Sequence, residues 1–157
     1  MFGKVARWLR LFGYDTLYYN VFDDDDILKV AKAENRIIIN KDKLLTQRAI
    51  KDNIEALYID EKDLVSRIAV IKKKYSIKTE IQRPPSSNSL CPLCNSKIIK
   101  VKDKKEIIDK VYESTYNHYN DFWKCSNPEC QKIYYVGEHW NDFKTFLIKL
   151  DNKMKEI

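Results

Sequence analysis

Glycine is scarce in this chain, and long apolar runs are missing from it. Only 3 of the 157 residues are glycine, no internal repeat or low-complexity tract occurs, and hydrophobic residues make up 44%. This composition excludes a fibrous or disordered chain, and it suffices for one medium domain or two small ones. No apolar run approaches the roughly 20 residues that a membrane-spanning helix needs, so we expect no membrane partner.

The N-terminal stretch lacks the features of an export signal. Residues 1–15 are basic and amphipathic, without a continuous apolar segment or a small-residue cleavage site. We therefore expect a cytoplasmic protein. In a reducing compartment, closely spaced cysteine pairs are more often metal ligands than disulfides.

The charge of the chain is moderately basic. It has 29 basic and 23 acidic side chains, which leaves a net charge of +6. A basic surface attracts polyanions such as nucleic acids. Because many basic proteins bind no nucleic acid, the charge alone favours a nucleic-acid partner only modestly.

Residues 1–83 alternate between helical and strand patterns. Helical spacing of apolar residues occurs near residues 5–12, 27–33, 43–51 and 64–71, and β-prone runs occur at Thr16–Tyr19, Ile37–Ile39 and Ala56–Ile59. Strand–helix–strand alternation with short connections predicts an α/β fold in which helices cover a parallel sheet.

A polar, proline-containing segment at residues 84–89 divides the chain. Two consecutive prolines followed by serine and asparagine cannot continue a helix, so we interpret the segment as a linker. Residues 90–157 then form a second unit. Phe143, Phe146, Leu147 and Leu150 predict an amphipathic helix at its end.

The second unit contains all four cysteines of the chain, in two close pairs. They are Cys91, Cys94, Cys125 and Cys130, spaced as C-x2-C and C-x4-C. Four thiolates at about 2.3 Å satisfy the tetrahedral preference of Zn²⁺ and leave no position open for water, which predicts a structural ion. Two disulfides, four unligated cysteines, or an iron ion in the same cage are the alternatives.

Acidic residues follow each of the three predicted strands. Asp23 to Asp26 come after the first strand, Asp42 after the second, and Asp60 after the third. The carboxyl ends of parallel strands are where ligands bind in such sheets, and clustered carboxylates suit Mg²⁺ or Mn²⁺. These ions activate water for phosphodiester cleavage. Alternatively, each acid simply caps the helix that follows it.

Basic residues near these acids are candidate phosphate ligands. Arg7 and Arg10 are expected on one face of the first helix, and Lys41 and Arg48 follow the second strand. Arginine binds phosphate bidentately. A solvated helix face explains the same residues equally well.

Several segments, taken together and in order, resemble a known family. They are GKVARWLRLFGYDTLYYN, DDDDILKVAKAENRIIINKD, CPLC, FWKCSNPEC and KIYYVGEHW. The chain resembles the PIN-like ribonuclease family named for the mut-seven C-terminal domain. This resemblance implies a PIN-like nuclease domain over residues 1–83, followed by a small zinc ribbon with a C-terminal helix. It also implies metal-dependent cleavage of RNA.

The resemblance assigns roles to individual residues. Asp25, with Asp24 beside it, matches the acid that opens the family's second helix. Asp42 matches the acid of the family's T-R-D motif, which reads Asn40-Lys41-Asp42 here. The four cysteines match the zinc ligands, although the second pair is wider than the usual C-x2-C. Asp60 is a candidate from its position alone.

One family feature is absent from the sequence. The family normally begins with a short strand that ends in an aspartate, just before the methionine that is Met1 here. Either the true start lies upstream, or the protein lacks one catalytic ligand and only binds RNA. Without that strand we expect an unpaired edge at Ile37–Ile39, which a helix or a partner chain would cover.

Three functional hypotheses follow. The first is a divalent-metal-dependent endoribonuclease acting on single-stranded or structured RNA. The second is a non-catalytic RNA-binding module that lacks one catalytic acid. The third is a protein–protein adaptor that docks through the ribbon.

Overall fold

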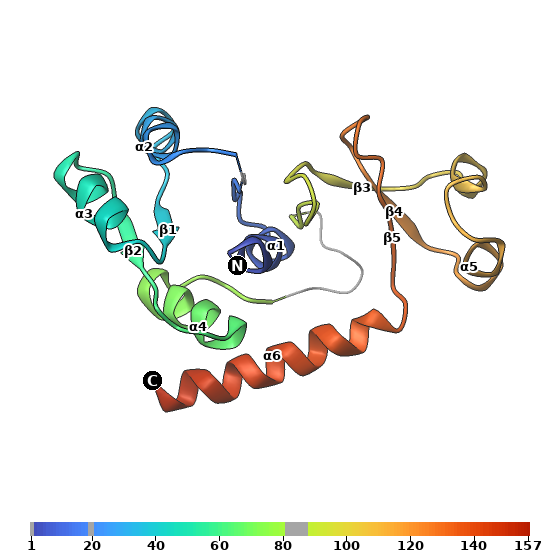
Figure 1. The fold of residues 1–157 in the computed structure, drawn as a ribbon. Coiled ribbons are helices and arrows are strands. Elements are labelled where there is room, and N and C mark those ends of the chain that lie inside the picture. The colour runs from blue at the N-terminus through green and yellow to red at the C-terminus, as the bar shows by residue number, and fades with distance from the viewer. Residues whose placement is uncertain (1, 19–20, 81–87) are drawn as a thin grey trace.

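The structure, a computed structural model, describes residues 2–18, 21–80 and 88–157 and has a mixed α/β fold (Figure 1). Its first half contains α1 (Gly3–Leu11), α2 (Asp24–Ala33), β1 (Ile38–Asn40), α3 (Lys43–Lys51), β2 (Ala56–Tyr58) and α4 (Leu64–Tyr75). The second half contains β3 (Ile98–Lys100), the short 3-10 helix η1 (Lys104–Ile107), α5 (Glu113–His118), β4 (Phe122–Cys125), β5 (Ile133–Tyr135) and α6 (His139–Glu156). Residues 84–87 of the predicted linker lie outside the described part.

The two strands of the first half form the parallel pair that the alternating pattern predicts. Ile38 is in register with Ala56, and Asn40 with Tyr58. α3 connects the two strands, and Leu28, Leu45 and Ala49 pack around Ile38 in one buried cluster. The isoleucine run therefore forms a strand that is shifted by one residue toward Asn40, and Ile38 is its buried member.

The first predicted strand is not formed at Thr16–Tyr18, and Tyr19 lies outside the described residues. Side chains, not a neighbouring strand, satisfy the backbone here. The Thr16 N–H donates to Asn95 Oδ1 at 3.0 Å, and Arg10 Nε donates to the Thr16 carbonyl at 2.8 Å. The expectation of three strands each followed by acids is wrong at this point.

One edge of β1 is open. Ile38 N–H donates to the Glu55 carbonyl and the Asn40 carbonyl accepts from Ile59, so the backbone groups of Ile39 point away from β2. Within the described ranges no strand pairs with that edge. A groove of about 840 Å³ lies there, and its lining includes Leu9, Ile39 and Ile71.

Aspartates cap the N-termini of three α-helices. The carboxylate of Asp23 accepts from Asp26 N–H at 2.9 Å, and that of Asp42 accepts from Leu44 N–H at 2.8 Å and from Leu45. α4 is capped by Asp63, which accepts from Ser66 N–H at 2.9 Å. Capping therefore accounts for Asp23 and Asp42, whereas the alternative that Asp60 caps α4 is wrong.

The main core joins α1, α4 and α6. Val5, Leu9, Ile68 and Leu150 are buried together, and Figure 1 shows α6 running along both halves of the chain. The Trp8 ring stacks on Phe146 with centroids 3.7 Å apart. The predicted C-terminal helix thus packs its apolar face on the first half. Among the described residues, no helix is both long and apolar enough to cross a bilayer.

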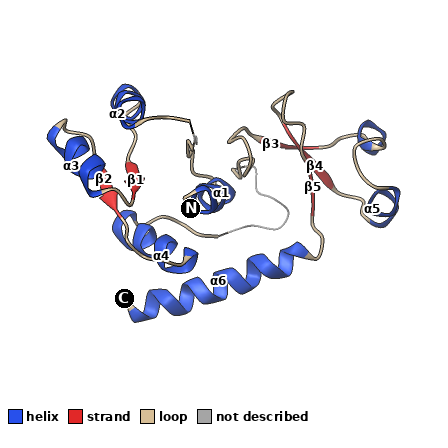
Figure 2. Cartoon of the chain, in the orientation of Figure 1, coloured by secondary structure: helices blue, strands red, loops and turns tan. Residues whose placement is uncertain are grey.

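The second half forms a three-stranded antiparallel sheet (Figure 2). Ile98 is in register with Cys125, and Phe122 with Tyr135. The long connection between β3 and β4 contains η1 and α5, and it packs Val101, Ile107 and Phe122 into a small core of their own. The wide separation of the two cysteine pairs is therefore an insertion in a hairpin.

We predict that Leu150→Ala lowers the free energy of unfolding by about 2–5 kcal/mol, because it leaves a cavity in the core. Leu150 is 0% exposed. The matched control is Ile148→Ala on the same helix, which is 62% exposed and should change stability by less than about 0.5 kcal/mol. Chemical denaturation followed by circular dichroism measures both, and equal effects would show that α6 does not pack in the core.

Candidate functional site

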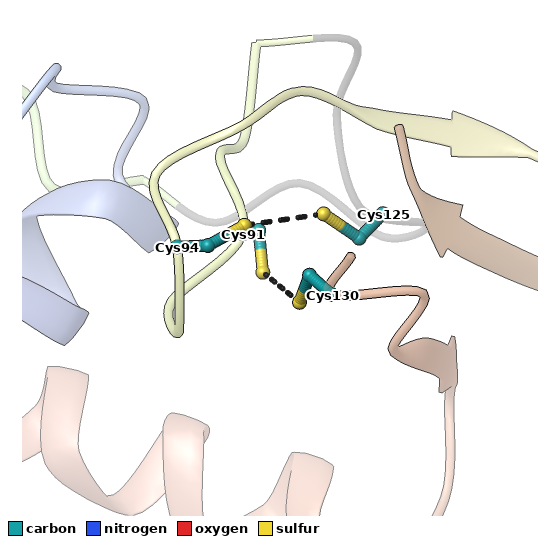
Figure 3. A group of neighbouring side chains, drawn as sticks. All are labelled: Cys91, Cys94, Cys125 and Cys130. Atoms are coloured by element: carbon teal, nitrogen blue, oxygen red, sulfur yellow. Dashed lines mark hydrogen bonds between the residues drawn. The ribbon is translucent and has the colours of Figure 1, made fainter. Parts of the chain in front are cut away.

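The four cysteine sulfurs converge on one point (Figure 3). The Sγ atoms of Cys91 and Cys130 are 3.8 Å apart, those of Cys94 and Cys125 are 3.3 Å apart, and all four lie within 4.8 Å of one another. A tetrahedral zinc ion with bonds of about 2.3 Å requires sulfur separations of about 3.8 Å. All four cysteines are free rather than disulfide-bonded, and the cluster can hold one metal ion such as zinc.

Turns position each pair of cysteines. Asn95 N–H donates to the Cys91 carbonyl at 2.8 Å, and Cys91 N–H donates to the Ser96 carbonyl at 2.7 Å. Asn95 has a φ of 70°, a left-handed conformation that asparagine tolerates better than most residues.

The wider second pair is closed by Asn127. Its N–H donates to the Cys125 sulfur at 3.4 Å, and its Oδ1 accepts from Glu129 N–H at 2.9 Å. The extra residues of the C-x4-C spacing therefore form a side-chain-capped turn. This turn brings Cys130 back beside Cys91.

The surroundings of the sulfurs shift the pKa values of the thiols in different directions. Burial raises the pKa of the Cys94 thiol, but hydrogen bonds from the side chain and backbone of Ser96 outweigh this and lower the pKa to about 6. Burial raises the pKa of Cys125 and of Cys130. The Tyr134 hydroxyl lies 3.0 Å from Cys91 Sγ and can donate to a thiolate there. A cation would displace protons from Cys125 and Cys130 on binding, so its affinity should rise with pH.

Two of the predicted acids lie at the carboxyl edge of the parallel sheet. Asp42 and Asp60 each follow the paired residues Asn40 and Tyr58 by two positions, and both are exposed. Parallel strands end at the same edge, so these carboxylates belong to one side of the sheet. Asp42 Oδ1 already accepts the two amides at the start of α3.

The other two predicted acids, Asp24 and Asp25, form ion pairs with Arg48, a residue predicted to bind RNA. Arg48 Nη2 contacts Asp25 Oδ1, and Arg48 Nη1 lies 3.7 Å from Asp24 Oδ2. The hydrogen bond from Arg48 and its charge lower the pKa of Asp25, and Asp25 in turn raises the pKa of Arg48. These charges therefore neutralise one another in the structure.

The structure does not gather the acids into a cage. In the described part of the chain, the cysteines are the only group of three or more metal-binding side chains close enough to share an ion. Asp24 and Asp25 meet through Arg48, whereas Asp42 and Asp60 share only the sheet edge. No ligand cluster joins these two sets.

The predicted basic residues divide by exposure. Arg7, Lys41 and Arg48 are exposed, whereas Arg10 is only 6% exposed. The expectation that Arg7 and Arg10 share a solvated face is wrong for Arg10, because its guanidinium donates to the carbonyls of Pro92 and Leu93 at 2.9 and 3.1 Å. The sequence contained a signal for the burial of Arg10, because Arg10 lies one helical turn after Ala6 and therefore on the same buried face of α1.

Comparison with known proteins places this geometry in a family. A family model described as the Mut7-C RNAse domain matches residues 1–147. The chain belongs to the Mut7-C RNAse domain family. No curated protein and no solved structure matches it significantly. The Mut7-C match includes the acidic strand ends, the four cysteines and the first half of α6.

We predict that this Mut7-C protein binds one zinc ion per chain, and that Cys91→Ser and Cys130→Ser abolish stoichiometric binding. Serine keeps the size of the side chain but cannot supply a thiolate. Elemental analysis of protein purified without chelators measures the metal. Ser126→Ala, next to Cys125 but exposed, should retain it. Wild-type protein without stoichiometric metal would overturn the zinc site, and iron in place of zinc would reassign the ion.

Proposed function

We propose that the protein is a divalent-metal-dependent endoribonuclease that cleaves RNA phosphodiester bonds at the carboxyl edge of β1 and β2. The observation that carries this proposal is the Mut7-C RNAse match over residues 1–147, which includes every candidate acid. The position of Asp42 and Asp60 at a parallel sheet edge supports it, since ligands bind at such edges.

Asp25 and Asp42 are the residues proposed to hold Mg²⁺ or Mn²⁺, with Asp24 and Asp60 as further ligands. A bound ion would polarise the phosphodiester, activate water and stabilise the leaving oxygen. Asp42 would use the oxygen that does not cap α3. Asp25 and Asp24 are paired with Arg48 and must be released to bind a cation.

RNA itself offers a way to release them. A phosphate accepts two hydrogen bonds from a guanidinium. Arg48 is exposed, so an RNA phosphate can reach its guanidinium. If Arg48 turns from Asp25 to an RNA phosphate, the carboxylate becomes free for a cation while the RNA backbone is held nearby. Arg7 and Lys41 are exposed cations that would add to this attraction.

The cysteine site takes a structural role in this proposal. Four thiolates complete the tetrahedral coordination of zinc and leave no position for a reacting water. The ion would hold the turn at residues 91–94 against the end of β4.

A second candidate is a non-catalytic RNA-binding module. Two observations favour it: in the described residues the acids form no shared ligand site, and Asp25 is neutralised by Arg48. Such a module would bind RNA through its exposed cations and leave it intact.

We predict that Asp42→Asn reduces RNA cleavage at least about 100-fold in Mn²⁺, because it removes a charged metal ligand. Asparagine is as good an N-cap as aspartate, so α3 should remain folded. Asp63→Asn, which alters the equivalent cap of α4, is the matched control and should cleave normally. Single-stranded and hairpin RNAs with end labels report the products. Equal cleavage by both variants would refute the assignment of Asp42.

The two candidates differ in a binding experiment as well. For the RNA-binding module we expect salt-sensitive RNA binding and intact RNA at millimolar Mn²⁺. Lys41→Ala should then reduce the slope of log affinity against log salt by about one unit, since it removes one phosphate contact. Cleavage that disappears in Asp42→Asn would exclude this candidate.

A further inference from the structure

Arg10 is a buried cation that contacts the first cysteine turn although it lies 82 residues before Pro92 in the chain. It lies in the last turn of α1 and is only 6% exposed. Its Nη1 donates to the carbonyls of Pro92 and Leu93 at 2.9 and 3.1 Å, and its Nε donates to Thr16 at 2.8 Å. One guanidinium therefore joins α1, the segment after it, and the residues between Cys91 and Cys94.

Backbone and side-chain bonds extend this contact in both directions. Leu90 N–H donates to the Arg10 carbonyl at 2.9 Å, and Ser89 Oγ donates to the Leu11 carbonyl at 3.0 Å. Gly13 has a φ of +93°, and a Cβ there would lie 2.9 Å from the Asn88 carbonyl oxygen. The chain at residues 88–90 thus fits closely against the end of α1.

Asn95 completes the contact on the other side of the turn. Its Oδ1 accepts from Thr16 N–H at 3.0 Å, and its Nδ2 donates to Asp15 Oδ1 at 2.5 Å. Asp15 Oδ2 in turn accepts from Arg36 Nη2 at 2.7 Å, just beyond α2. A continuous set of hydrogen bonds therefore runs from the cysteine turn through Asp15 to Arg36.

The two carbonyls that accept from Arg10 belong to the residues between two metal ligands. A metal ion bound by Cys91 and Cys94 fixes the backbone between them, and so fixes the positions of the Pro92 and Leu93 oxygens. Without the ion the turn is held by fewer bonds, and its carbonyls can move away. The loss of these two acceptors from Nη1 of a buried guanidinium is costly, so such movement would also destabilise α1.

We propose that Arg10 is a positioning residue that couples metal binding at the four cysteines to the folding of α1 and the segment Tyr14–Thr16. The coupling rests on the metal site put forward above. Because it is thermodynamic it acts in both directions: the ion stabilises α1, and an intact Arg10 strengthens ion binding. Loss of the metal therefore loosens the end of α1 and the segment Tyr14–Thr16.

The first test compares two arginines on one helix in the full-length protein. Zinc affinity is measured by competition with a chromophoric chelator for wild type, Arg10→Gln and Arg7→Gln. Arg10→Gln should bind zinc about tenfold more weakly or worse. Arg7→Gln, which removes an exposed charge three residues away, should stay within about twofold of wild type. Equal affinities for all three proteins would overturn the coupling.

Arg10→Lys separates charge from geometry. Lysine keeps the positive charge but lacks the planar fork that reaches several carbonyls. We expect it to weaken zinc binding as well. Wild-type affinity in Arg10→Lys would show that charge alone acts, and would overturn the positioning role.

A second measurement uses the wild-type protein alone, so its result does not depend on whether a variant folds. Hydrogen exchange of the Tyr14 and Thr16 amides, which donate to Leu9 and to Asn95, is followed with zinc and after chelation. Chelation should accelerate exchange there at least about tenfold, while amides in the middle of α3 change little. Unchanged exchange at Tyr14 and Thr16 in protein that binds zinc would overturn the coupling alone. Failure of wild type to bind metal would instead overturn the metal site itself.

Discussion

The contact between the Arg10 guanidinium and the carbonyls of Pro92 and Leu93 makes the two halves of this chain one structure. A buried cation must keep its acceptors, so α1 and the first cysteine turn cannot separate without a large cost in free energy. The stacking of Trp8 on Phe146 adds a second link through α6. The cysteine site is therefore joined to the first half of the chain by direct contacts.

The open edge of β1 is the second constraint on function. The Nδ2 atom of Asn40 and the hydroxyl oxygen of Tyr75 are buried at this groove, and neither atom has a hydrogen-bond partner in the described part of the chain. Unpaired buried polar groups are unusual in folded proteins. The groove lies beside the strand that leads to Asp42. The proposed active site thus lies next to a groove in which two buried polar atoms are unpaired. In the same region the candidate acids do not converge on one point.

Local patterns along the chain predicted much of this structure. The strands at Ile38–Asn40 and Ala56–Tyr58, the caps at Asp23 and Asp42, and the C-terminal helix all follow from signals within a few residues. The four cysteines were found by spacing alone. The β-prone residues Thr16–Tyr18 form no strand, because the side chains of Arg10 and Asn95 bind the backbone of Thr16, and no local pattern reveals these contacts.

By itself, the sequence determined the helices of the first half, β1 and β2, the C-terminal helix, the caps at Asp23 and Asp42, and the four side chains that can bind a metal. These properties depend on periodicity, on helix-end chemistry and on ligand type, all of which are local. Only the tertiary structure decided that Arg10 is buried and that Arg48 neutralises Asp25. These depend on residues that lie far apart in the chain and meet only after folding, as Arg10 and Pro92 do.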